Sequence, residues 1–174
     1  MKRLSLVGST VLLSLCLLHA PFASAVVYLT AEEFVASSFD AEPAVQNLWL
    51  KEPHQQAAKK LLGHSYRSLR LRYWVAGDRT AWVLDEIGKE QPITIGVVIV
   101  NNEIQDVKIL SYRESRGGEV RHPFFTNQFN GLFLRSNGRL SERINGISGA
   151  TLSVRAVSNV SRFALFLHKQ IVSL

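Results

Sequence analysis

The chain has 174 residues, 47% of them hydrophobic, and a formal net charge of +6, so it can form one domain whose core needs no disulfide bonds. Lys2 and Arg3 lie at the apolar N-terminus, which leaves a charge near +4 (6 − 2) on the remainder. That charge is modest and evenly spread, and we therefore expect no nucleic-acid partner. Cys16 is the single cysteine and lies in the N-terminal stretch. Beyond it, disulfides, thiol catalysis and cysteine metal sites are excluded.

Residues 1–25 have the pattern of a signal peptide. Lys2 and Arg3 precede an uncharged apolar stretch over residues 4–18, and Ala23-Ser24-Ala25 matches a small-x-small cleavage site. We predict cleavage after Ala25 and a periplasmic or extracytoplasmic location. The alternative is a retained anchor with membrane association, for which about 20 apolar residues are needed. That anchor would also leave the domain outside, because the positive residues stay on the cytoplasmic side.

Residues 26–64 are predicted to form an N-terminal helical segment. Thr30-Ala31-Glu32-Glu33 is a capping box, which predicts the start of a short helix. The pattern over residues 55–62 predicts a second helix, with Gly63 as its C-terminal stop. Between them, residues 43–53 are bounded by two prolines and are predicted to be an irregular connection.

From residue 65 the hydrophobic pattern changes to a period of two, which predicts β-strands. The predicted strands cover residues 69–75, 80–87, 93–100 and 103–112. Residues 93–100 are nearly all apolar and β-branched, so this strand is expected in the middle of the sheet, covered on both faces. Asn101-Asn102 predicts a hairpin turn, because asparagine tolerates positive φ.

The last third of the chain predicts loops followed by a long helix. Residues 113–122 form a polar loop, and residues 123–129 predict a helical turn. From Leu152 onward apolar residues recur at helical spacing. The predicted class is therefore α+β, with an antiparallel β-meander packed with N-terminal helices and a long C-terminal helix. We expect residues 65–174 to form the functional domain.

The run Ser148-Gly149-Ala150-Thr151 stands just before that helix. Gly149 allows the backbone to approach a ligand closely, and Ala150 adds little bulk. The start of a helix carries unpaired N–H groups and a partial positive charge, which together suit a phosphate. A threonine hydroxyl at this place is well positioned to be esterified. The alternative interpretation is an ordinary loop followed by a threonine or serine N-cap.

The segment Asn145–Ser153 resembles the flavinylation motif of the FMN-binding domain family. That family includes flavin-bearing components of the sodium-pumping NADH:quinone oxidoreductase and of the related Rnf complex, as well as stand-alone exported flavin carriers. The resemblance covers residues 65–170, and Tyr112–Gly117 is similar to the family's Glu-Thr-x-Gly loop. It implies that a magnesium-dependent flavin transferase, with FAD as donor, attaches FMN through its phosphate to Thr151. Ser148, Gly149 and Ala150 complete the implied attachment motif.

Three further residues are cofactor-binding candidates, two of them in a loop that the resemblance places near the flavin. Glu114 and Ser115 lie in the loop that packs near the flavin. The Glu114 carboxylate either bonds ring or ribityl donors, or holds the loop to backbone N–H groups. Trp82 is a candidate to stack on the isoalloxazine ring, with a place in the core as the alternative. Arg113, Arg116 and Arg121 either balance the phosphate or form a solvated basic loop.

The resemblance implies an exported electron carrier that relays electrons between membrane redox partners, rather than a stand-alone enzyme. One departure favours another function. Asn145 stands where many family members have an acidic residue that the transferase reads. The alternative is a non-redox periplasmic binding or assembly module with the same fold that is not efficiently flavinylated. A small flavin reductase ranks last, because the sequence has no nicotinamide-binding fingerprint.

Overall fold

The computed structural model describes residues 25–172, which form an α+β fold. Its centre is a six-stranded antiparallel sheet with the strand order β1-β6-β5-β4-β3-β2. The strands are β1 (Val26–Val27), β2 (Ala44–Trp49), β3 (Arg70–Ala76), β4 (Arg79–Ile87), β5 (Pro92–Val100) and β6 (Glu103–Tyr112). The predicted leader, with Cys16 and most of the cleavage site, lies outside the described residues.

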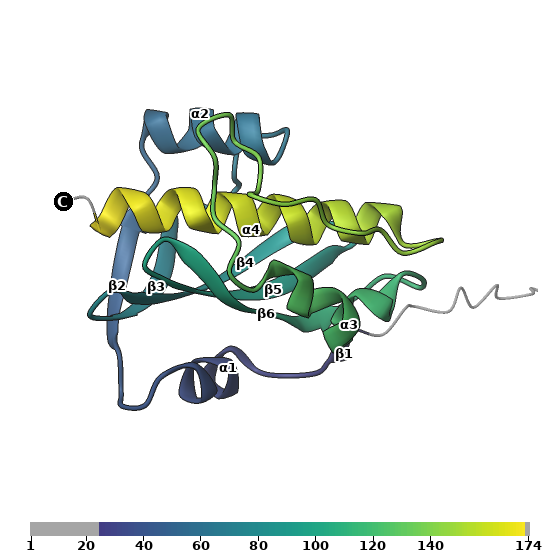
Figure 1. Ribbon diagram of the computed structural model, residues 1–174, viewed down its shortest axis with the longest axis horizontal. Coiled ribbons are helices and arrows are strands. Elements are labelled where there is room, and N and C mark those ends of the chain that lie inside the picture. The colour runs from purple at the N-terminus through teal and green to yellow at the C-terminus, as the bar shows by residue number, and fades with distance from the viewer. Residues whose placement is uncertain (1–24, 173–174) are drawn as a thin grey trace, which may run out of the picture.

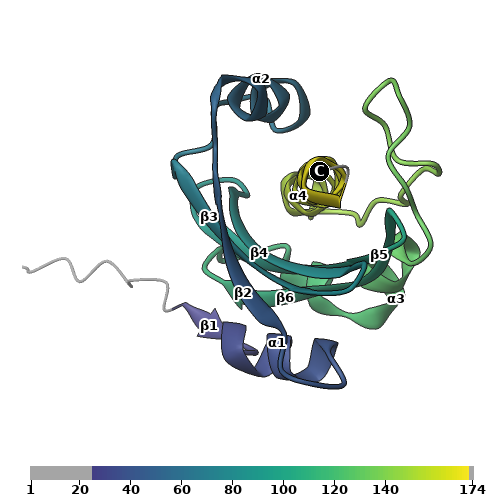
Figure 2. The ribbon, with the colours of Figure 1, turned by 90° about the vertical axis from the view of Figure 1, so that its left-hand side faces the viewer.

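The helices lie on both faces of this sheet (Figure 1). They are α1 (Ala31–Ser38), α2 (Glu52–Leu61), the short α3 (Pro123–Thr126) and α4 (Thr151–Val172), with 3-10 turns η1 (Gly118–Arg121) and η2 (Asn127–Phe129). Figure 2 shows α4 in the concave face of the curved sheet and α1 on the opposite face. The predicted long C-terminal helix is thus confirmed. Within residues 25–172, no helix combines the length and apolar character needed to cross a membrane.

Strand β5 is covered on both faces, as its sequence predicts. Ile93, Ile95, Val97 and Ile99 are fully buried in the larger core cluster, which also holds the apolar face of α4. On the other face, Val98 joins the smaller cluster built around Phe34 of α1. The sheet therefore supports α4 along its apolar face. This packing fixes the position of the N-terminus of α4.

The segment 43–53 differs from the prediction of an irregular connection. Residues Ala44–Trp49 form strand β2, which pairs antiparallel with β3 from Ala44↔Val75 to Trp49↔Arg70. Five of its six residues are exposed, so β2 lacks the alternating pattern that marks a half-buried strand. Its pairing comes from the neighbouring strand β3, which the local sequence does not reveal. Residues 26–64 therefore contain two strands in addition to the two predicted helices.

Two local predictions are confirmed in detail. The Thr30 hydroxyl accepts a hydrogen bond from the Glu33 N–H at 3.1 Å, and the Glu33 carboxylate accepts one from the Thr30 N–H at 2.8 Å. This reciprocal pair is the capping box that starts α1. The turn between β5 and β6 places Asn101 and Asn102 at φ of 52° and 64°, which asparagine adopts more readily than most residues.

Candidate functional site

The N-terminus of α4 is exposed to solvent and begins at Thr151. The turn before it is closed by the Ala150 N–H, which donates to the Ile147 carbonyl at 3.0 Å. The Val154 N–H then donates to the Ala150 carbonyl at 2.9 Å. The N–H groups of Thr151, Leu152 and Ser153 precede this bond and have no partner within the helix. With the partial positive charge of a 22-residue helix, they favour an anion at this end.

An open hollow of about 590 Å³, here called the first hollow, lies at this helix start. One wall is the helix start itself, where the Thr151 side chain is exposed. The other wall is the loop that follows β6 together with the β4–β5 turn. The lining residues are Lys89, Glu114, Ser115, Arg116, Gly149, Ala150, Thr151, Leu152 and Ser153. The hollow therefore joins a free hydroxyl, unpaired N–H groups and two cationic side chains.

Glu114 ties the β6 loop to the β4–β5 turn. Its Oε1 accepts hydrogen bonds from the backbone N–H groups of Lys89, Glu90 and Gln91, at 2.5, 2.6 and 2.9 Å. Burial acts to raise the pKa of Glu114, but these three donors and the Lys89 charge outweigh it and lower the pKa below its ordinary value. The carboxylate was expected either to bond the flavin or to hold the loop to backbone N–H groups. The structure shows the second role, since Glu114 binds the N–H groups of the β4–β5 turn.

The Glu114 carboxylate can bind this turn because it approaches the backbone closely at Gly88. A Cβ on Gly88 would lie 2.8 Å from Glu114 Oε1 and 3.1 Å from Ile93 Cδ1. Because Ile93 is fully buried, the backbone has little room to retreat. A glycine at this position lets the carboxylate sit directly over the turn.

The loop is also held to α4 itself. The Tyr112 hydroxyl donates to the Arg116 carbonyl at 2.5 Å and lies 2.8 Å from the Ser153 hydroxyl. Gly117 has a φ of +86°, and a Cβ there would lie 2.7 Å from Ser153 Oγ and 3.4 Å from Ala150 Cα. The loop is therefore packed against the first turn of the helix. This packing fixes the positions of the two walls of the first hollow relative to each other.

Five of the seven predicted cofactor-binding residues meet in the first hollow, and two do not. Thr151, Gly149, Ala150, Glu114 and Ser115 line it. Ser148 is exposed in the preceding turn but is not part of the lining. Trp82 is fully buried in the core on β4, stacked on Tyr73 with ring centroids 4.8 Å apart. Trp82 was expected either to stack on the flavin or to pack in the core, and its placement agrees with the core role.

This geometry suits a phosphate ester. An exposed hydroxyl, the unpaired N–H groups of a helix start and the cations Lys89 and Arg116 are the groups that bind phosphate in proteins. Comparison with known families adds an independent finding. Residues 88–165 match the model of the FMN-binding domain family. A search of curated proteins found no match.

The family match indicates FMN as the cofactor. The matched segment, somewhat less than half of the chain, contains β5, β6, the Glu114 loop and most of α4. It therefore includes every residue that lines the first hollow. Those residues fit the phosphate end of FMN, with Thr151 and the helix start to hold it. Bound there, FMN would supply one- and two-electron redox chemistry.

Lys89 and the tyrosine–serine pair are site residues that the sequence pattern missed. Lys89 lies in the β4–β5 turn and reaches the hollow only because β4 and β5 are paired and Glu114 holds their turn. Tyr112 and Ser153 are 41 positions apart in sequence. Arg116, one of the predicted phosphate partners, does line the hollow. Arg113 instead donates to the Pro92 carbonyl and the Thr94 hydroxyl, both at 3.0 Å.

Replacing Glu114 with glutamine is expected to reduce stability at neutral pH by about 1 kcal/mol or less, since this charge is partly exposed and screened. The pKa of Glu114 is lower in the folded chain than its ordinary value of 4.5. Its contribution is therefore present above 4.5 and is lost as pH falls through the lowered folded pKa. Thermal melts of both chains from neutral pH into strong acid check this. The difference between them should vanish in acid.

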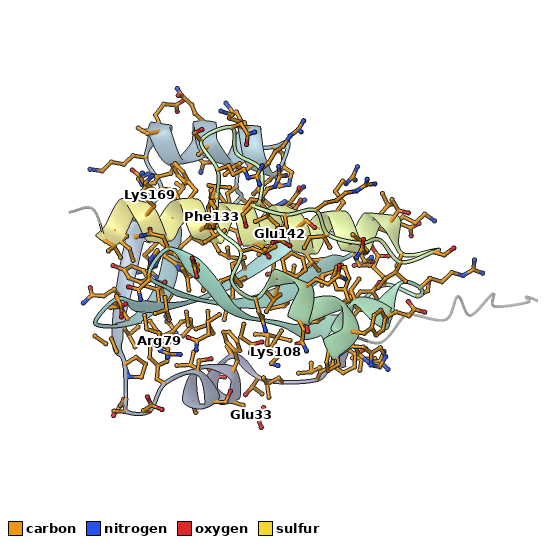
Figure 3. The ribbon with its side chains drawn as sticks, viewed as in Figure 1. Glu33, Arg79, Lys108, Phe133, Glu142 and Lys169 are labelled. Atoms are coloured by element: carbon orange, nitrogen blue, oxygen red, sulfur yellow. The ribbon has the colours of Figure 1, made fainter. Side chains whose placement is uncertain are left out.

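Glu142 supplies the matched control, because it is an exposed glutamate on another loop (Figure 3). Glu142→Gln is expected to leave the melting profile unchanged. A Glu114→Gln chain that melts like the wild type at neutral pH would show that the three N–H bonds add nothing to stability.

Proposed function

We propose that this chain is an exported flavoprotein electron carrier whose FMN is linked covalently, through its phosphate, to Thr151. The observation that carries the proposal is the place of Thr151. It is an exposed hydroxyl at the first residue of a 22-residue helix, inside a hollow that cations and N–H groups line. The family match over residues 88–165 supports flavin as the group bound there.

The phosphodiester keeps one negative charge, which this end of α4 is suited to hold. The linkage leaves the isoalloxazine ring free, so electrons can enter and leave it in separate steps. The chain positions the cofactor and supplies its electrostatic surroundings, while the flavin supplies the chemistry. We propose a membrane-bound redox partner as the source or acceptor of electrons, and an extracytoplasmic location on the basis of the predicted leader.

Attachment requires a second protein in this proposal, a magnesium-dependent flavin transferase with FAD as donor. The transferase must reach Thr151 and the turn before it. Ser148, Gly149 and Asn145 are all exposed. The Asn145 N–H donates to the Gln128 side-chain oxygen at 2.8 Å, a bond that uses the backbone and leaves the side chain at the surface. The segment is thus accessible in the folded chain.

The test is the intact mass of the purified chain after co-expression with a flavin transferase. A gain equal to FMN minus water, mapped to the peptide that contains Thr151, is the expected result. A colourless chain of unmodified mass would contradict it and favour the non-redox binding or assembly module. In that case Asn145→Asp would show whether the missing acidic side chain is the cause, because the charge would restore loading.

A further inference from the structure

A second hollow lies beside the first one and shares Lys89 with it. Its volume is about 570 Å³, and it lies between the end of α2, the β4–β5 turn and α4. Its lining includes the apolar residues Leu62 and Ile87 and the polar residues His64, Arg67, Arg155 and Asn159. His64 and Arg67 lie upstream of the family match, so part of this hollow is built by the N-terminal half of the chain.

The two hollows lie along one face of α4. Thr151 lines the first, while Arg155 and Asn159 line the second. Positions four residues apart lie on the same side of a helix, and each such step advances about 6 Å along the axis. A ring joined to the Thr151 hydroxyl through a phosphate and a ribityl chain is long enough to bridge one such step.

The linings of the hollows differ in chemical character. The first hollow presents hydroxyl groups, backbone N–H groups and charges, which suit a phosphate and a polyol chain. The second combines the side chains of Leu62 and Ile87 with hydrogen-bond donors on Arg155 and Arg67. An isoalloxazine ring has the same two parts, an apolar benzenoid end and a pyrimidine edge rich in acceptors.

The second hollow is lined by more cationic side chains than carboxylates. Its carboxylate, on Glu86, is 6% exposed, and His64 Nε2 lies 3.0 and 3.1 Å from its two oxygens. Lys89 lies 3.0 Å from the exposed Glu90. Arg155 is exposed, and it stands on the same helix face as Thr151. The Arg155 side chain lines this hollow, where its charge also acts on the Glu86 carboxylate, and it is a cation on the side where the tethered group would lie.

We propose that the second hollow receives the isoalloxazine ring of the FMN carried by Thr151, with Arg155 beside the ring as the positive charge that favours its reduction. This inference rests on the proposed function. A ring that takes up two electrons and one proton gains one negative charge. A neighbouring guanidinium stabilises that reduced ring more than the neutral oxidised ring. Arg155 therefore tunes the potential of the cofactor.

A redox titration of the FMN-loaded full chain tests Arg155, with dithionite as electron donor and flavin absorbance as the readout. Arg155→Gln is expected to weaken the relative stability of the reduced ring tenfold, a shift of about 30 mV for a two-electron couple. Arg155→Lys keeps the charge and should stay near the wild-type potential. Lys169→Gln makes the same charge change near the other end of α4 (Figure 3) and should have no effect.

Flavin fluorescence tests the placement of the ring independently. Ser65 is exposed and lines the second hollow, so Ser65→Trp would bring an indole against the ring and quench most of the emission. Gln56→Trp, on the exposed side of α2, is the control and should leave the emission unchanged. Thermal melts establish that each variant is folded.

The outcomes separate the two proposals. FMN attached in every variant, with an unshifted potential in Arg155→Gln, would overturn the role of Arg155. Unquenched emission in Ser65→Trp would overturn the placement of the ring, and the covalent attachment would stand. A wild-type chain that gains no FMN mass would overturn the proposed function and this inference with it.

Discussion

Replacing Thr151 with valine is expected to abolish covalent flavin completely while the chain still folds. Valine keeps the β-branched shape and replaces the hydroxyl with a methyl group, so only the atom that forms the ester is removed. Thr151 is exposed at the first residue of α4, and an exposed substitution of this kind changes stability by about 0.5 kcal/mol at most. Loss of the adduct in this variant would therefore reflect lost chemistry, not unfolding.

The measurement is intact mass after co-expression with the transferase, compared with the wild type and with two hydroxyl controls. Ser136→Ala removes an exposed hydroxyl that lies outside the attachment motif and does not line the first hollow, and it should retain the adduct. Thr151→Ser keeps a hydroxyl at the same place, and it should also be modified. A flavin-linked Thr151→Val chain would place the ester on another residue and refute the assignment.

The parts of the fold that could be predicted from sequence are those with local causes. The capping box at Thr30, the two asparagines between β5 and β6, and the apolar run of β5 each depend on neighbouring residues. Strand β2 could not be predicted, because its mostly exposed residues carry no alternating pattern and its pairing with β3 is a contact between distant segments. Local propensity is weak where burial does not support it.

In the site, too, the features with local causes could be predicted and those that depend on distant segments could not. The helix-start wall could be predicted because Gly149, Ala150 and Thr151 are consecutive and stand before a strongly periodic helix. The opposite wall depends on Glu114 binding the N–H groups of residues 89–91 from more than 20 positions away. No pattern within the β4–β5 turn indicates that Lys89 faces Thr151. The pairing of β4 with β5, the Glu114 hydrogen bonds and the Tyr112–Ser153 contact together bring these two walls close to each other.

Trp82→Ala is expected to be more destabilising than any of the substitutions at the site, at about 3–5 kcal/mol. Trp82 is fully buried between the sheet and α4. Its indole N–H donates to the Thr80 hydroxyl at 3.0 Å, and that hydroxyl lies 2.8 Å from His168 Nδ1. Alanine would leave a cavity beside the stacked Tyr73 and remove one partner from a buried polar group.

Denaturant unfolding measures this loss as a lower midpoint with an unchanged slope. Phe124→Ala is the matched control, because that ring is 64% exposed and its removal should change stability by about 0.5 kcal/mol or less. Trp82→Phe separates the core role from the flavin-stacking role that its aromatic side chain suggested. It keeps an aromatic ring and loses the indole N–H, so the chain should be less stable, yet the bound flavin should keep its absorption spectrum. An altered spectrum would place Trp82 against the flavin and contradict its assignment to the core.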